Sequence, residues 1–199
     1  MAEFTIISDT STTILNMLQK KIHENNALIG SNLGISLISP SESNVDYQLG
    51  LYLYDVRELA EYGRTAPVIE GNFRIHPPKL LELSYMLFVN HRGQNRIDAT
   101  TEQNIFGCAV QTIYDTPTMN IITLEPSSEQ SEETVRLSVI NHTFEDKVKI
   151  WSAFQSPHRL SVCFNVSPVV LSSHRKDEIN RVTEAIVTAK QNTNAPQRK

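Results

Sequence analysis

Three features are scarce in this sequence of 199 residues, and each scarcity excludes a class of protein. It has two cysteines, Cys108 and Cys163, so it holds neither a disulfide framework nor a zinc site with paired cysteine ligands. No run approaches the ~20 apolar residues that a membrane helix needs. The net charge is −4, whereas a nucleic-acid binder needs a basic surface that displaces phosphate counterions. We therefore expect neither a membrane nor a nucleic acid among its partners.

The sequence also lacks the motifs of common catalysts, because it contains no glycine-rich nucleotide loop, no G-x-S-x-G, no H-E-x-x-H and no C-x-x-C. His76 and His91 bracket one predicted strand, and at ~3.3 Å per residue they would lie about 45–50 Å apart, too far to share a metal. A nucleophilic cysteine–histidine pair is the remaining enzymatic alternative. However, Cys108 lies on an apolar helix stripe and nothing marks Cys163 as activated. The sequence therefore predicts no catalytic residue, no metal site and no cofactor.

What is present suits one folded domain, with or without a tail. Hydrophobic residues make up 40% of the chain and charged residues 20%, which is enough to bury a core. The N-terminal residues MAEFTIISDTSTT carry an acid where a signal peptide places positive charge, and no apolar segment follows. We therefore expect a cytoplasmic protein when it is made.

Hydrophobic periodicity predicts an alternation of helices and strands. Helices are expected from Thr10 to Asn25, from a cap at Asp98 or Thr100 to Asp115, and from Thr143 to Ser156, with a marginal helix over 176–190. Strands are expected over 33–38, 46–56, 79–89, 119–124, 135–139 and 160–171. A loop or extended arm is expected over 57–74 and an acidic loop over 125–133. Adjacent strands favour hairpins. The fold class is therefore α+β: a small, mainly antiparallel or mixed sheet with helices packed on one face.

The strand after Pro77 and Pro78 is the most clearly marked. Proline is tolerated at the first residue of a strand and poorly inside one, so the two prolines set its start. Its odd-numbered residues place five apolar side chains on one face: Leu81, Leu83, Tyr85, Leu87 and Val89. Met86 and Phe88 make the other face apolar as well. That second patch needs a cover, which either a helix of this chain or a partner would supply.

Five stretches, taken in order, carry a resemblance to a known family. They are IISDTSTTILNML; LGLYLYDVREL with the following Tyr62-Gly63-Arg64 turn; RIHPPKLLELSYMLFV; FGCAVQTIYDTP; and KIWSAFQSPHRLSVCFNVSPVVLSS. Each stretch alone is ordinary strand or helix sequence. In this order and spacing, over residues 4–173, they resemble the cap, or tail-terminator, proteins of phage-tail-like contractile injection systems of the antifeeding prophage and Photorhabdus virulence cassette type.

This resemblance implies a tail-terminator-like cap domain over residues 1–173 and a partly helical or flexible C-terminal extension over 174–199. It implies a structural protein without enzymatic activity, which forms a hexameric ring on the inner tube and outer sheath of an assembled particle. The mechanism would be steric termination with loop contacts and strand addition at an exposed sheet edge. Two alternatives stay open: a head–tail completion or terminator protein of a contractile phage, and a small Cys–His hydrolase.

Arginines recur in the segments with the least evident core role, which are residues 57–73 and the stretch after Ser173. The planar guanidinium group suits protein interfaces. The predicted partner-contact residues are Arg57, Tyr62, Arg64, Arg74, Arg92, Arg96, Arg175 and Lys176.

Overall fold

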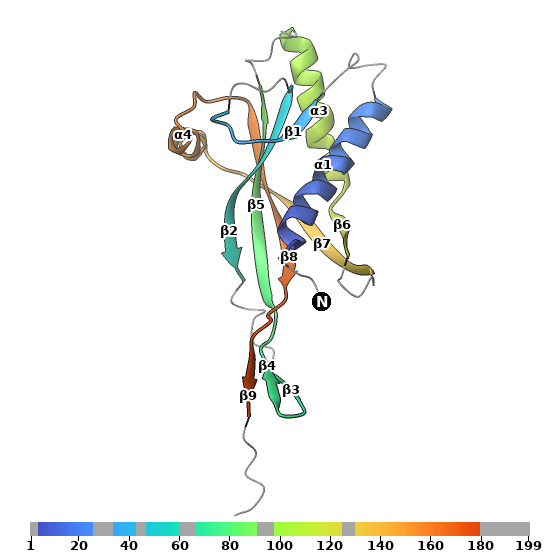
Figure 1. Ribbon diagram of the computed structural model, residues 1–199. Helices are drawn as coiled ribbons and strands as arrows, with labels where there is room; N and C mark the ends of the chain where they lie inside the picture. Colours follow the sequence, from blue (N-terminus) through green and yellow to red (C-terminus); the bar gives the residue numbers. More distant parts are fainter. Residues whose placement is uncertain are drawn as a thin grey trace, which may run out of the picture.

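A mixed six-stranded sheet forms the centre of the protein, as the computed structural model shows (Figure 1). The structure describes residues 4–25, 34–42, 47–59, 67–90, 98–124 and 130–179. The elements are α1 (Ile6–Glu24), β1 (Ile35–Leu37), β2 (Leu49–Glu58), β3 (Val68–Glu70), β4 (Phe73–Ile75), β5 (Lys79–Val89), α3 (Ala99–Asp115), β6 (Thr118–Leu124), β7 (Gln130–Ile140), α4 (Phe144–Ala153), β8 (Ser161–Leu171) and β9 (Lys176–Glu178). The strand order is β1-β2-β5-β8-β7-β6, with β1 parallel to β2 and the other neighbours antiparallel. The predicted α+β class with a mixed sheet is confirmed.

Two predicted boundaries differ from the structure. Helix α1 begins at Ile6 rather than Thr10, because Thr10 and Ser11, residue types that favour a helix N-cap, lie inside the helix. The hydroxyls of Thr10 and Ser11 donate to the carbonyls of Ile6 and Ile7, four residues earlier. Both hydroxyls therefore form hydrogen bonds within the helix instead of capping its N-terminus. Residues 130–133, expected in an acidic loop, belong to β7, where pairing with β6 holds them.

The two faces of the sheet have separate cores. Helices α1 and α3 cover the first face, where Leu83 and Tyr85 are fully buried. On the opposite face Trp151 of α4 packs with Met86 and Phe88 (Figure 1). A helix of the same chain therefore covers the second apolar patch of β5. The prediction of helices on one face holds for α1 and α3, while α4 lies on the other.

Close packing at the second core depends on a glycine. Gly50 of β2 lies directly opposite Phe88 of β5, and a Cβ added there would come within 2.2 Å of the Phe88 ring. The Phe88 ring makes edge-to-face contacts with Tyr47 and Trp151, at centroid distances of 6.2 and 5.5 Å. Tyr47 lies in the second core although Leu49, two residues later, lies in the first, because β2 and its alternation begin only at Leu49.

A second, three-stranded sheet has the order β3-β4-β9, and we refer to it as the arm. The predicted loop over 57–74 thus contains a hairpin, whose turn has Gly71 at φ +59°. The predicted helix from Lys176 is wrong for its first residues, since Lys176–Glu178 pair with β4 as β9. Backbone pairing with a distant strand overrides a weak helical periodicity. Residues 180–190 of that helix lie outside the described residues.

Candidate interface

The arm continues the central pair of strands beyond the main sheet. Chain segments 76–78 and 172–175 connect β5 to β4 and β8 to β9, and the arm projects away from the helices (Figure 1). The last pair of the main ladder joins Lys79 to Leu171, and pairing resumes between Ile75 and Lys176. Prolines lack the N–H group that a ladder needs. Pro77-Pro78 therefore separates the arm from the main sheet.

One carboxylate links strand β9 of the arm to the chain that leads out of β4. Asp177 Oδ2 lies 2.6 Å from His76 Nε2, and Arg175 Nε donates to Asp177 Oδ1 at 3.2 Å. The backbone N–H of His76 also donates to the carbonyl of Arg175 at 3.2 Å. The hydrogen bond with His76 holds the pKa of Asp177 below its usual value, and Arg175 adds to the effect. His76, for which the sequence indicates no partner, thus joins β4 to β9.

The arm exposes apolar side chains on both of its faces. Val68 is 58% exposed, Ile69 55% and Phe73 47%, and no described residue of the three strands belongs to either core. Ile69 and Arg74 are cross-strand partners and therefore share one face, whereas Phe73 lies on the other. Within the described part of the chain, Arg74 makes no ion pair. This mixture of apolar and charged groups is typical of a protein-contact surface.

The structure brings together three of the eight residues predicted to contact partners. Arg74 lies on β4, Lys176 lies on the paired strand β9, and Arg175 directly precedes β9. Arg57 lies near the end of β2, where its Nε is 2.7 Å from Asp55 Oδ2. The other four lie outside the described residues: Tyr62, Arg64, Arg92 and Arg96. A partner contact for any of the eight stays a prediction.

The main sheet has an open edge along β2. Strand β1 pairs with β2 only over Leu49–Leu51, so from Leu53 to Glu58 the outer edge of β2 has no partner strand among the described residues. Val56 in this stretch is 44% exposed. Unpaired N–H and C=O groups along a strand edge are a template for an added strand.

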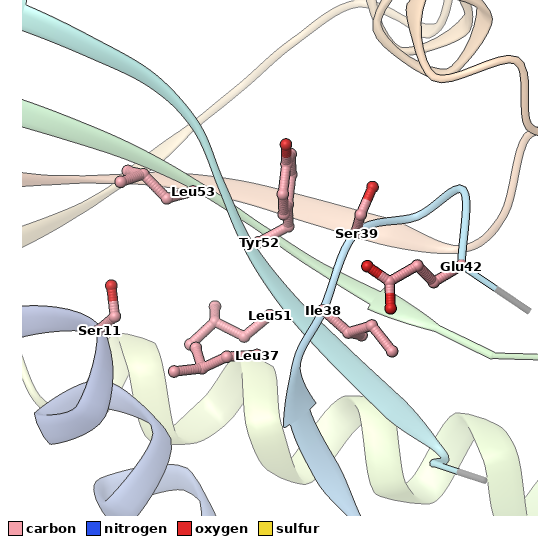
Figure 2. Close-up of a pocket in the computed structure, with 8 residues that line it drawn as sticks. All are labelled: Ser11, Leu37, Ile38, Ser39, Glu42, Leu51, Tyr52 and Leu53. Atoms are coloured by element: carbon pink, nitrogen blue, oxygen red, sulfur yellow. The ribbon is translucent and has the colours of Figure 1, made fainter. Parts of the chain in front are cut away.

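Beside this edge lies an open pocket of about 460 Å³, which we call the edge groove (Figure 2). Its lining comes from α1, from β1 and the turn after it, and from both faces of β2: Ser11, Leu37, Ile38, Ser39, Glu42, Leu51, Tyr52 and Leu53. Leu37 is 45% exposed, whereas Leu51 is fully buried. Apolar and polar groups contribute about equally to the lining of the groove, and Glu42 is its one carboxylate.

Contacts with the rest of the domain fix the walls of the edge groove. Ser11 shares a 2.8 Å hydrogen bond with Tyr85, whose burial raises the pKa of its phenol to about 12. On the other wall, the turn Ser39–Glu42 is closed by a backbone hydrogen bond of 3.1 Å between its end residues. Ser156 Oγ donates to the carbonyl of Pro40 at 2.9 Å and ties this turn to the end of α4. The groove is preformed, which lowers the entropic cost of docking.

The cysteines lie in packed surroundings. Cys163 is 1% exposed within the second core, and burial raises the pKa of its thiol, whereas a nucleophilic cysteine needs a lowered one. Cys108 packs against the first core. Among the described residues, no three His, Cys, Asp or Glu side chains cluster as metal ligands would. None of the described helices has the length and apolar character that crossing a membrane requires.

These features define an α+β protein with a projecting arm and an open sheet edge, and comparison with known proteins places it in a family. Residues 9–185 match the model of the Pvc16 N-terminal domain, and the chain belongs to that family. The resemblance to terminators of contractile injection systems is thereby confirmed. A search of curated proteins found no match.

Two solved structures share the fold. The sheath/tube terminator of PVC, an extracellular contractile injection system, in its extended state, matches with a TM-score of 0.59 and 16% identity, over 99% of this chain and 67% of that one. The tube-terminating cap of the anti-feeding prophage matches with a TM-score of 0.52 and 14% identity, over 87% of this chain and 59% of that one. This chain is thus equivalent to part of each terminator.

Proposed function

We propose that this chain is a structural cap, which terminates the inner tube and outer sheath of a contractile injection particle as a ring. The observation that carries the proposal is the family match over residues 9–185, and the fold shared with two terminators supports it. The partners are other copies of this chain in a hexameric ring, the sheath protein and the inner tube protein. The cap is made in the cytoplasm and becomes part of the assembled particle.

The open edge of β2 and the arm supply the contacts that this role needs. A partner segment adds to β2 along Leu53–Glu58, next to the three residues that β1 already occupies. The arm reaches beyond the domain and presents apolar side chains to a second neighbour. Different surfaces that meet head to tail produce a ring when the rotation between copies closes. A closed ring offers no further site for growth, which is how the cap stops polymerisation.

We further propose that the cap acts without catalysis and that residues 174–199 form an extension distinct from the cap domain over 1–173. The raised pKa of the buried Cys163 thiol supports a non-catalytic role. Both comparison structures come from contractile injection systems, which favours a cap over a head–tail completion protein of a phage.

The proposal is tested by deleting the gene and imaging the particles by electron microscopy. We expect tubes and sheaths of irregular length, or sheaths that detach from the tube, because nothing fixes their end. Complementation with the wild type or with Cys108→Ala should restore uniform particles, whereas a cysteine hydrolase would lose function with the variant. Uniform, fully assembled particles in the deletion strain would rule out the capping role.

A further inference from the structure

We propose that the arm of one copy docks in the edge groove of the next copy, with Ile69 entering the groove and Arg74 opposite Glu42. The inference rests on the proposed ring and names the contact that builds it. Its participants are Ile69 and Arg74 on one face of the arm, and the groove lined by Leu37, Leu51, Leu53 and Glu42.

The arm has little to stabilise it within its own chain. Its strands are three residues long, and none of its described residues belongs to either core. Small isolated sheets are marginally stable in water unless they pack an apolar face against something. Ile69 is 55% exposed and offers such a face. A partner surface that buries this side chain would therefore order the arm.

The edge groove has the size to receive this side chain, and part of its mixed lining is apolar. A volume of about 460 Å³ accommodates a few side chains, within the ~300–1,000 Å³ range of binding pockets. Leu37 projects into the opening and is 45% exposed, so it loses contact with water when Ile69 packs against it. Its neighbour Leu51 forms a fully buried floor.

Charge complementarity selects a second copy as the occupant. Arg74 is the cation beside Ile69, and Glu42 is the carboxylate of the groove lining; within the described residues neither makes an ion pair. On the arm face that carries Ile69 and Arg74, Asp177 is already bound by His76 and Arg175. The remaining charged residues of the three strands lie on the opposite face of the arm: Glu70, Lys176 and Glu178. The Ile69 face of the arm and the groove thus each combine an apolar side chain with one charge that has no ion-pair partner among the described residues, and the two charges are of opposite sign.

The contact has to form between copies. Arg74 and Tyr85 are eleven positions apart on a nearly continuous extended segment, so about 36 Å separates them at ~3.3 Å per residue. Tyr85 touches Ser11 in the wall of the edge groove. The arm therefore lies far from the groove of its own chain, and Figure 1 shows its strands at the opposite end of the molecule from β1, which lines the groove. A protrusion and a socket at different places on one subunit make a heterologous contact, which is the kind that closes a ring.

The first test is disulfide trapping in intact particles with the double variant Glu42→Cys, Arg74→Cys. Oxidation should link each arm to the next groove and give a ladder of covalent multimers on a non-reducing gel. The matched control is Glu42→Cys, Glu178→Cys, which places the second cysteine on the opposite face of the same arm and should give no ladder. A double variant that is present in particles without a ladder, or an equal ladder in the control, would overturn the contact.

The second test reverses the charges and measures how much of the protein purified particles retain. Arg74→Glu and Glu42→Arg should each weaken the association of copies about tenfold or more, because like charges then face each other. The combined reversal restores opposite charges and should recover the wild-type amount, while Glu178→Arg should not change it. Undiminished single variants, or a combined variant no better than the singles, would contradict the proposal.

The two proposals fail in different ways. A deletion strain with uniform particles, together with a ladder in the purified protein, would reject the cap and keep the contact between copies. Irregular particles in the deletion strain, together with no ladder in complemented particles, would keep the cap and reject the contact.

Discussion

Strands β5 and β8 of the main sheet are joined to strands β4 and β9 of the arm, but the main sheet and the arm lie in very different environments. Between Leu83 and Val89, β5 is buried on both faces by helices of its own chain. Beyond Pro77-Pro78 the same path continues as β4, where Phe73 is 47% exposed. The main sheet therefore obtains its stability from packing, whereas the arm relies on backbone pairing and on the contact between His76 and Asp177. Such a division is expected when one part of a subunit holds its shape and the other meets a neighbour.

Truncating one aromatic side chain in each region should produce the largest contrast. Trp151→Ala should lower the free energy of unfolding by about 3–5 kcal/mol, because a fully buried ring that also donates to Ser161 Oγ at 3.2 Å is lost. Phe73→Ala should change it by no more than about 0.5 kcal/mol, because the ring lies outside both cores. Urea unfolding followed by circular dichroism measures both.

Trp151→Phe is the control, since it keeps most of the apolar volume and should lose less than the alanine variant. Equal losses for Trp151→Ala and Phe73→Ala would mean that the arm unfolds as part of the core, and the proposed division between the two regions would be wrong.

The core was more predictable from the sequence than the arm because its signals are local. Alternation from Leu81 to Val89 predicts both buried faces of β5, and Pro77-Pro78 predicts where it starts. The position of α4 over Met86 and Phe88 could not be predicted, because the choice between a helix of this chain and a partner depends on tertiary packing.

The arm and the groove depend on pairings between distant residues. Segments 57–73 and 174–199 could be recognised as lacking a core role, but a three-residue ladder such as that of Phe73–Ile75 with Lys176–Glu178 has no local signature. The contact of Ser11 with Tyr85 joins residues 74 positions apart, and no local sequence pattern predicts it. The groove was therefore missed, whereas Arg74 was identified by its residue type and its place between two predicted strands.

A smaller change in stability should distinguish a glycine that close packing requires from a glycine that only lowers helix propensity. Gly50→Ala should destabilise the protein by about 1–3 kcal/mol, because the new methyl group would clash with the Phe88 ring and backbone or ring must shift. The matched control is Gly107→Ala in α3, where an added Cβ meets nothing within 4 Å. That change should stabilise the helix by up to about 1 kcal/mol. The fluorescence of Trp151, the only tryptophan, reports unfolding in both variants; a Gly50→Ala protein as stable as the wild type would contradict the close contact.

The smallest effect should be a pH dependence confined to the arm. Because the pKa of Asp177 is lower in the folded arm than in an unfolded chain, the folded arm binds fewer protons. The stabilisation is therefore complete above the unfolded pKa, about 3.9, and is lost as the pH falls through the folded value. Lowering the pH from about 5 to about 3 should speed amide hydrogen exchange at Phe73–Ile75 and Lys176–Glu178, after correction for intrinsic rates, and leave the buried part of β5 protected. Asp177→Asn should exchange quickly in the arm at both pH values; if it kept the wild-type pH dependence, another group would be fastening β4 to β9.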